Sequence, residues 1–257
     1  MGVIIKTPEE ISILREGGHR LARVLEAVSK MVKPGISTAE LDAYSEKLIR
    51  DGGDEPAFLN YRPAGARMAF PATLCVSVNN EVVHGIPSDK KILKEGDIVS
   101  LDCGLKHKGL FTDHAITVPV GKANKEARKL IEVTKESLYV GIVAAKGGAK
   151  TGDIGYAIQS YVKPFKYGIV RILSGHGVGK AIHEDPYIPN FGKKGSGVVL
   201  KPGMVVAIEP MLNMGTDDVI LLGDGYTYKT RDGALSAHFE HTILITEGEP
   251  EILTKVD

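Results

Sequence analysis

Hydrophobic residues recur at helical spacing near the start of the chain. Before them, Thr7-Pro8-Glu9-Glu10 offers a helix cap, a proline at the first helical position and a capping-box glutamate. After them, Lys33-Pro34-Gly35 ends the pattern. We therefore predict a helix from about Thr7 to Lys33. Its apolar face consists of Ile11, Leu14, Leu21, Val24, Val28 and Met31.

A second helical pattern begins at Ser37 or Thr38 and ends at Gly52-Gly53. A loop rich in proline and glycine follows it. Strand-like runs then come at 73–78, 98–104 and 110–120.

The same order of elements recurs in the second half of the chain. Helical patterns cover about 125–145 and 151–166, and strand-like runs follow at 169–173, 203–211, 219–222 and 238–246. The turns between paired helices also match at an offset of 113 residues, as shown by Lys33/Lys146, Gly35/Gly148, Thr38/Thr151, Glu40/Asp153 and Leu41/Ile154. We predict one α+β domain over 1–257, with pseudo-twofold halves of roughly 1–122 and 123–257.

Composition and charge narrow the functional class. The 257 residues include 32 basic and 32 acidic ones, so no global basic field favours nucleic acid. No apolar run is long enough to span a membrane, and the N-terminus lacks a signal-peptide layout. Two cysteines without CxxC spacing favour a reducing compartment. We expect a cytoplasmic protein without nucleic-acid specificity.

Two aspartates on neighbouring strand-like runs are the first candidates for chemistry. If the hairpin turns about His107-Lys108, Asp102 and Asp113 lie opposite each other on one face. Like charges so placed are destabilising, with Cβ atoms roughly 5 Å apart. Two divalent cations about 3.5–4 Å apart, bridged by carboxylates, would stabilise them.

Two glutamates lie in strongly apolar surroundings. Glu209 ends the run Val205–Ile208, and Glu240 begins a second apolar run. Buried acids are rare unless they are paired or bind metal. The segment between them is irregular, so the sequence gives no register for this pair.

Three histidines are functional candidates. His176 lies in a glycine-rich turn, His183 follows seven residues later, and His84 precedes a glycine. His238 shares the parity of Glu240 and is a candidate to lie behind it. A histidine taken alone is more often structural than functional. The chain lacks a complete P-loop, an HExxH motif and a GxSxG elbow.

Together these residues carry a family resemblance. The chain resembles the methionine aminopeptidases of the pita-bread fold over nearly its whole length, and specifically the short, bacterial-style type I form. Only 31 residues separate Glu209 from Glu240, which leaves no room for the type II insertion. The motifs are Val78-Asn-Asn-Glu-Val-Val-His84-Gly-Ile-Pro87, Leu101-Asp102-Cys-Gly, Thr112-Asp113, Gly175-His176-Gly-Val-Gly, Ile182-His183-Glu-Asp-Pro186, Ala207-Ile-Glu209-Pro-Met and Phe239-Glu240-His-Thr.

The resemblance implies a central antiparallel sheet between the two halves, and a dinuclear metal site. It assigns Glu209 as general base, His183 as stabiliser of the tetrahedral intermediate, and His84 as a contact to the amide nitrogen. The cofactors would be two divalent ions, with Mn, Fe or Co favoured and Zn or Ni as alternatives. The implied metal ligands are Asp102, Asp113, His176, Glu209 and Glu240.

The resemblance also implies a methionine pocket formed by Phe70, Cys75, Ile182 and Tyr226. Position 182 is usually aromatic in the family and position 226 is usually tryptophan, and the loop from Asn60 to Met68 is longer than usual. The implied substrates are nascent polypeptides with a small second residue. Ribosome association and a monomeric state are further expectations.

Two alternatives remain open at this point. A prolidase or prolyl aminopeptidase shares the fold but usually has an extra N-terminal domain. A non-catalytic binding protein on the same scaffold would lose metal ligands, whereas this chain retains all five. We therefore favour the aminopeptidase.

Overall fold

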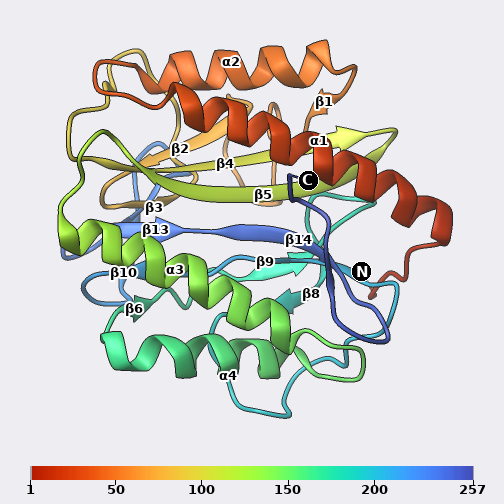
Figure 1. The fold of residues 1–257 in the computed structure, drawn as a ribbon. Coiled ribbons are helices and arrows are strands. Elements are labelled where there is room, and N and C mark those ends of the chain that lie inside the picture. The colour runs from red at the N-terminus through yellow and green to blue at the C-terminus, as the bar shows by residue number, and fades with distance from the viewer. Residues whose placement is uncertain (1, 257) are drawn as a thin grey trace.

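The computed structural model describes residues 2–256, so Met1 and Asp257, the ends of the predicted domain, lie outside the described residues. Figure 1 shows helices α1 and α3 lying across a central sheet, with α2 beyond α1 and α4 beyond α3. The helices span Pro8–Met31 (α1), Thr38–Asp51 (α2), Lys125–Ala144 (α3) and Thr151–Val162 (α4), and a short 3-10 turn, Lys163–Phe165, follows α4.

Capping explains where the first two helices begin. Thr7 caps α1, with its side chain accepting from the Glu10 N–H and the Glu10 carboxylate accepting from the Thr7 N–H. Ser37 and Glu40 form the same box on α2. All four predicted helices are confirmed, although α4 becomes a 3-10 turn before its predicted end.

The large sheet has nine strands and is antiparallel throughout. Its main path runs β1-β4-β5-β14-β9-β7-β8, with β2 paired to β4 and β15 paired to β14. Its strands are β1 (Glu55–Pro56), β2 (Leu74–Val78), β4 (Ile98–His107), β5 (Leu110–Pro119), β7 (Gly175–Gly177), β8 (Glu184–Ile188), β9 (Val205–Ile208), β14 (Glu240–Leu244) and β15 (Glu251–Ile252).

Two three-stranded sheets complete the fold. One has the order β13-β10-β6 and the other the order β11-β12-β3. Their strands are β3 (Glu81–Val83), β6 (Gly168–Ile169), β10 (Met211–Asn213), β11 (Val219–Leu221), β12 (Tyr228–Thr230) and β13 (Ser236–His238). The run predicted at 203–211 is thus two strands, separated at Glu209-Pro210, because proline has no N–H to donate to a ladder.

The β4–β5 hairpin corrects the predicted register. Asp102 lies opposite Ala115, and Asp113 lies opposite Gly104, so the two aspartates are diagonal rather than direct neighbours. The turn falls one residue later than predicted, at Lys108-Gly109, where φ is 47° and 86°. A two-residue turn with two positive φ values suits the strand twist, and glycine adopts such a φ easily. The register changes by two residues, which is an even number, so both aspartates still point to the same face of the sheet.

The predicted internal repeat appears in the hydrogen bonds. The N–H of Gly35 donates to Leu93, and that of Gly148 donates to Leu200, each over 2.8 Å. Further along, the N–H of Gly96 donates to Val120 O, just after β5, and that of Gly203 donates to Ile245 O, just after β14, each over 2.9 Å. Asp102 and Glu209 lie six residues beyond these two glycines. The two halves therefore deliver equivalent carboxylates to the middle of the sheet.

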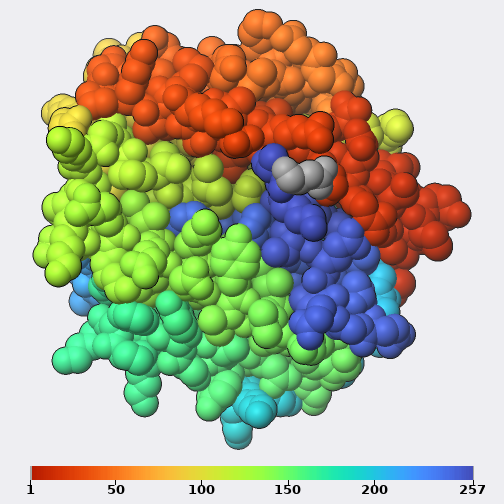
Figure 2. Space-filling model, in the orientation of Figure 1, coloured from red at the N-terminus to blue at the C-terminus, as the bar shows by residue number. Residues whose placement is uncertain are grey.

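Two apolar cores hold the helix pairs against the sheet. One packs α1 and α2 through residues such as Leu21, Leu25 and Leu41, and the other packs α3 and α4 through residues such as Leu130 and Ile154. Figure 2 shows this face closed by helical side chains, with the blue C-terminal segment lying between the two pairs. Acidic side chains on the other face of the sheet therefore point away from the helices.

A buried ion pair ties the N-terminal segment to the loop before β8. Lys6 Nζ lies 2.6 Å from Glu184 Oε2, and both side chains are almost fully buried. The other Glu184 oxygen accepts from the N–H of Ala181 over 3.0 Å. The Lys6 N–H also donates to Gly203 O over 2.8 Å.

We expect Lys6→Met to lower the free energy of unfolding by about 3–5 kcal/mol, because it leaves the Glu184 charge buried and unpaired. Urea unfolding measures the loss. Lys180→Met is the matched control, since it breaks the exposed Lys180–Glu10 pair, and it should cause a much smaller loss. Equal losses in the two variants would contradict a special role for burial.

Candidate metal centre

Five neighbouring strands of the large sheet each bring one predicted ligand to a common point. In the order β4, β5, β14, β9 and β7, these strands carry or directly precede Asp102, Asp113, Glu240, Glu209 and His176. Residues far apart in sequence thus converge because their strands are hydrogen-bonded neighbours. The sequence had given no register for the two glutamates. The pairing of β14 with β9 supplies it, with His241 opposite Ile208.

The ligand atoms form two overlapping clusters. Atoms of Asp102, Asp113 and Glu240 lie within 4.8 Å of one another, and so do atoms of His176, Glu209 and Glu240. His176 Nε2 lies 3.5 Å from Glu209 Oε1 and 4.0 Å from Asp113 Oδ2. All five residues predicted as ligands are therefore brought together, with Glu240 common to both clusters.

Electrostatics make this arrangement costly for the protein by itself. Burial raises the pKa of Asp102 to about 7. Burial first, and then repulsion from neighbouring carboxylates, holds the pKa values of Asp113, Glu209 and Glu240 well above their usual range. Burial also lowers the pKa of His176 to about 3, so this imidazole is neutral and supplies no compensating charge.

The donor set fits two divalent cations. Asp102 Oδ1 and Glu240 Oε1 are buried and have no hydrogen-bond partner within residues 2–256, so lone pairs remain for a ligand. Four carboxylates offset the charge of two divalent ions. Oxygen-rich sites with one imidazole suit Mn, Fe or Co better than sites rich in thiolate.

The ligands form one wall of a cavity of about 270 Å³. His84 and His183 also reach it, and its apolar part includes Phe70, Cys75 and Tyr226. Ile182 is buried in the same apolar cluster but is not among the described residues that line the cavity. A contact of Ile182 with the methionine side chain therefore stays a prediction, and its position beside Phe70, Cys75 and Tyr226 is compatible with it.

Tyr61 is a site residue that the sequence did not single out. Its hydroxyl lies 2.9 Å from His183 Nδ1, and the two rings are in contact. The His183 ring also meets the His176 ring edge to face, with centroids 4.5 Å apart. Burial raises the pKa of Tyr61 and lowers that of His183, so both are neutral at pH 7. When Tyr61 donates to Nδ1, the His183 proton resides on Nε2.

The loop that carries Tyr61 is held at both ends. The N–H of Phe70 donates to Tyr61 O over 2.8 Å, and the Tyr226 hydroxyl donates to Met68 O. Phe58 also lines the cavity from this loop. The unusual length of 60–68 was the one sequence signal that pointed here, and it did not identify a residue.

His84 has a backbone conformation that is rare for a non-glycine residue. Its φ is 57°, and its carbonyl accepts from the Thr227 hydroxyl over 3.3 Å. The ring meets that of Tyr228 edge to face. Such backbone strain clusters at functional sites, where surrounding structure holds it in place. Burial lowers the pKa of His84 to about 4.

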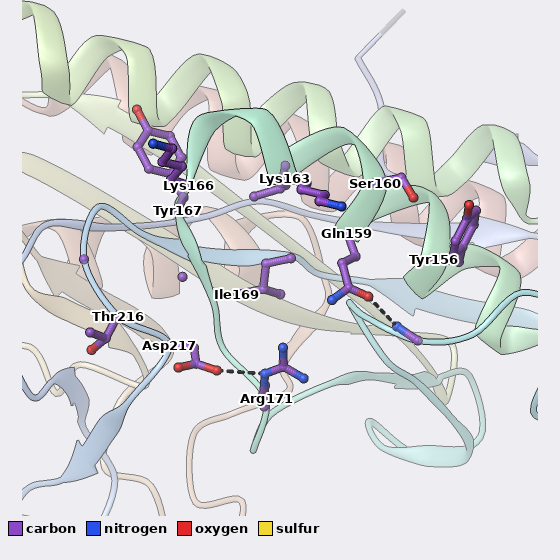
Figure 3. Close-up of a pocket in the computed structure, with 14 residues that line it drawn as sticks. Tyr156, Gln159, Ser160, Lys163, Lys166, Tyr167, Ile169, Arg171, Thr216 and Asp217 are labelled. Atoms are coloured by element: carbon purple, nitrogen blue, oxygen red, sulfur yellow. Dashed lines mark hydrogen bonds and ion pairs between the residues drawn. The ribbon is translucent and has the colours of Figure 1, made fainter.

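A second cavity, of about 640 Å³, lies beside α4. Figure 3 shows that its polar side chains do not converge on one point. Arg171 pairs with Asp217 over 2.7 Å, and Gln159 accepts from the N–H of Gly192. This cavity lacks the clustered ligands of the first, so we place the functional site at the five-strand convergence.

Comparison with known proteins identifies the family of this chain. The sequence model of metallopeptidase family M24 matches residues 12–247. Methionine aminopeptidase 1 of Bacillus subtilis (strain 168) is 48% identical over 99% of this chain and 100% of its own length. Methionine aminopeptidase of Aquifex aeolicus (strain VF5) is 46% identical over the whole of both chains. This chain belongs to the methionine aminopeptidases of metallopeptidase family M24.

Solved structures of the M24 family confirm the expected pita-bread fold. The methionine aminopeptidase of Rickettsia prowazekii has a TM-score of 0.94, with 40% identity, and covers 98% of this chain and 100% of its own. The prolidase of Pyrococcus furiosus has a TM-score of 0.76 with 28% identity, and this chain covers 66% of it. No helix in the described part of the chain is long and apolar enough to cross a membrane.

The raised carboxylate pKa values predict how the metal-free protein responds to pH. The folded acids retain protons that the unfolded chain, with pKa values of about 4, has lost. Their stabilisation is therefore present at low pH and is lost as pH rises through the folded pKa, which is about 7 for Asp102. Between pH 7 and 8 we therefore expect the unfolding free energy to fall more steeply, or rise less, in this protein than in Asp102→Asn, which keeps the same buried histidines.

Urea unfolding of chelator-dialysed protein at the two pH values measures this loss. Asp102→Asn is the comparison, because it removes one titrating group and should reduce the pH dependence while both proteins keep their cysteines. The same pH dependence in both proteins would show that the Asp102 carboxyl is not held protonated.

Proposed function

We propose that this protein removes the N-terminal methionine from polypeptides whose second residue is small. The convergence of four buried carboxylates and His176 on one cavity carries the proposal, because this donor set suits two divalent metal ions. Full-length similarity to named methionine aminopeptidases supports the same activity. Mn, Fe or Co are the metals we favour, with Zn or Ni as alternatives.

The proposed metal ligands are the five residues at the convergence. Asp102 would serve one ion, His176 and Glu209 the other, and Asp113 and Glu240 both. When bound, the ions lower the pKa of water towards neutrality and polarise the substrate carbonyl. Glu209 accepts the proton of the attacking water as general base.

The apolar end of the cavity would hold the methionine side chain. Phe70 and Tyr226 pack edge to face with ring centroids 5.2 Å apart, and Cys75 lies beside them. Burial raises the pKa of Cys75 well above its usual value, so the thiol is neutral and behaves as a small apolar group. A flexible thioether fits such a surface, whereas a charged side chain would be desolvated without a partner.

The two cavity histidines would contact the scissile peptide. His183, with its proton on Nε2, donates a hydrogen bond to the carbonyl oxygen as negative charge develops there. His84 contacts the amide nitrogen that becomes the leaving amine. Tyr61 positions His183 by donating to Nδ1, which also links the loop at 58–70 to the reaction.

The remaining parts of the proposal concern the biological setting. Residues 1–257 act as one catalytic domain, in the cytoplasm, on the N-termini of nascent chains. Ribosome association and a monomeric state belong to the same proposal. Family resemblance supports these points.

A peptide assay tests the proposed activity. With Mn²⁺ or Co²⁺, we expect Met-Gly-Met-Met to release free methionine, and Glu209→Gln to release none because it lacks the general base. Release of the first residue from an X-Pro peptide without methionine release would instead favour the prolidase alternative. Folded protein that takes up no metal and cleaves neither peptide would support a binding protein.

His183 variants test the transition-state contact. We expect His183→Ala to lower kcat by roughly 10²–10³, because one donor to the developing oxyanion is lost. Tyr61→Phe should also lower kcat more than it changes KM, since it removes the hydroxyl that fixes the His183 tautomer but retains the ring. Tyr226→Phe is the comparison: its hydroxyl binds Met68 O rather than a histidine, so KM should change more than kcat. The same split in both tyrosine variants would contradict the positioning role.

A further inference from the structure

His238 is a buried imidazole whose hydrogen-bond needs are unmet. The residue is 1% exposed, yet neither Nδ1 nor Nε2 has a hydrogen-bond partner in the described part of the chain. Buried polar side chains are nearly always paired, and an unpaired one carries a desolvation cost. The groups that approach its ring therefore indicate its role.

Two candidate metal ligands are these groups. His238 Nε2 lies 3.7 Å from Glu209 Oε2 and 4.0 Å from Glu240 Oε2. Both distances are just beyond hydrogen-bond length. The opposite oxygen of Glu209, Oε1, is the one that approaches His176. His238 thus meets Glu209 from the side away from that proposed ligand.

The backbone prevents His238 from turning elsewhere. In the β13–β10 pair His238 lies opposite Met211, and its N–H donates to the Thr117 hydroxyl over 2.9 Å. That hydroxyl in turn donates to His238 O over 2.7 Å. These hydrogen bonds hold the main chain of His238 in place, so a hydrogen-bond partner for the ring must lie close to its present position.

His238 lies behind the carboxylates rather than in the cavity. Glu209 and Glu240 line the cavity wall, and His238 does not appear among the described residues that do. A side chain in this place contacts the ligands from outside. Even a neutral imidazole carries one N–H, and Nε2 is the ring atom that faces the two carboxylates.

We propose that His238 is a positioning residue for the metal centre: its Nε2–H donates to the outer carboxylate oxygens of Glu209 and Glu240 and orients both side chains for metal binding. This inference rests on the proposed metal centre and adds a residue that tunes its affinity. Hydrogen bonds from outside the ligand shell fix the orientation of a carboxylate ligand and typically change metal affinity by 10–100-fold.

Direct metal-binding measurements on the full chain test the role. Mn²⁺ is titrated into chelator-dialysed protein, and free Mn²⁺ is followed by its electron paramagnetic resonance signal. We expect His238→Met to weaken Mn²⁺ binding by about 10–100-fold, because the N–H donor is lost. His238→Gln should restore most of the affinity, because its side-chain amide supplies an N–H donor in nearly the same place. At saturating Mn²⁺, kcat should differ far less between the two variants than Mn²⁺ affinity does.

His241 supplies the matched control. It is also buried and is adjacent to Glu240, but its Nδ1 contacts the Thr254 hydroxyl over 2.9 Å and its ring stacks on His114 on the other face of the sheet. His241→Gln should therefore leave the Mn²⁺ affinity unchanged. Thermal unfolding without metal reports any general loss of folding. If His238→Met does not fold, the comparison of His238→Gln with His241→Gln tests the inference by itself. We then expect the Mn²⁺ affinity of His238→Gln to lie within about threefold of that of the unchanged protein.

Three results would overturn the inference. Unchanged Mn²⁺ affinity in His238→Met would show that the contact has no effect. Equal losses in His238→Met and His238→Gln would indicate that the imidazole itself is required, for example as a direct ligand. A loss in His241→Gln as large as that in His238→Met would indicate general destabilisation. If the unchanged protein binds no Mn²⁺, the proposed function fails instead, so the two failures are distinguishable.

Discussion

Mutual repulsion among four buried carboxylates is the constraint on which this structure depends. Asp102, Asp113, Glu209 and Glu240 lie on one face of the large sheet, at a point where burial and their shared charge both oppose ionisation. The protein supplies only neutral imidazoles beside them. Divalent cations remove this repulsion, so the same arrangement that is costly for the polypeptide favours metal binding.

The fold achieves this convergence by repetition. Each half contributes a helix pair and a pair of antiparallel strands, and equivalent turns at Gly35 and Gly148 make equivalent hydrogen bonds. Because of this repeat, Asp102 and Glu209 occupy equivalent positions in the two halves of the chain. The helix pairs close one face of the sheet, so the other face is free to hold charged side chains and a cavity.

Local signals in the sequence were sufficient to predict the helices and to single out the acids that converge in the structure. The capping residues Thr7 and Ser37 define helix starts through contacts within four residues, and acids inside apolar runs are unusual enough to stand out. The register of the β4–β5 hairpin was predicted wrongly, because it depends on which two residues of a short turn take positive φ. Lys108 and Gly109 take these φ values, so Asp113 lies opposite Gly104 and not opposite Asp102 as predicted.

Contacts between distant segments lay beyond sequence reasoning. No partner for Tyr61 could be predicted, because its contact to His183 spans 122 residues and depends on how the 58–70 loop folds back. Ile182 was expected in the pocket from the family resemblance, and in the structure it lies in the apolar cluster behind the cavity lining. For His238, parity alone indicated a position near Glu240. Its approach to Glu209 could not be predicted, because it depends on β13 and β14 being two separate strands.

The most direct test of the account is an anomalous-scattering map from crystals grown with Mn²⁺. The account predicts two peaks about 3.5–4 Å apart, both contacted by Asp113 and Glu240, with Asp102 on one ion and His176 and Glu209 on the other. An absence of peaks at the five-strand convergence, or ordered Mn²⁺ only elsewhere on the protein, would contradict it.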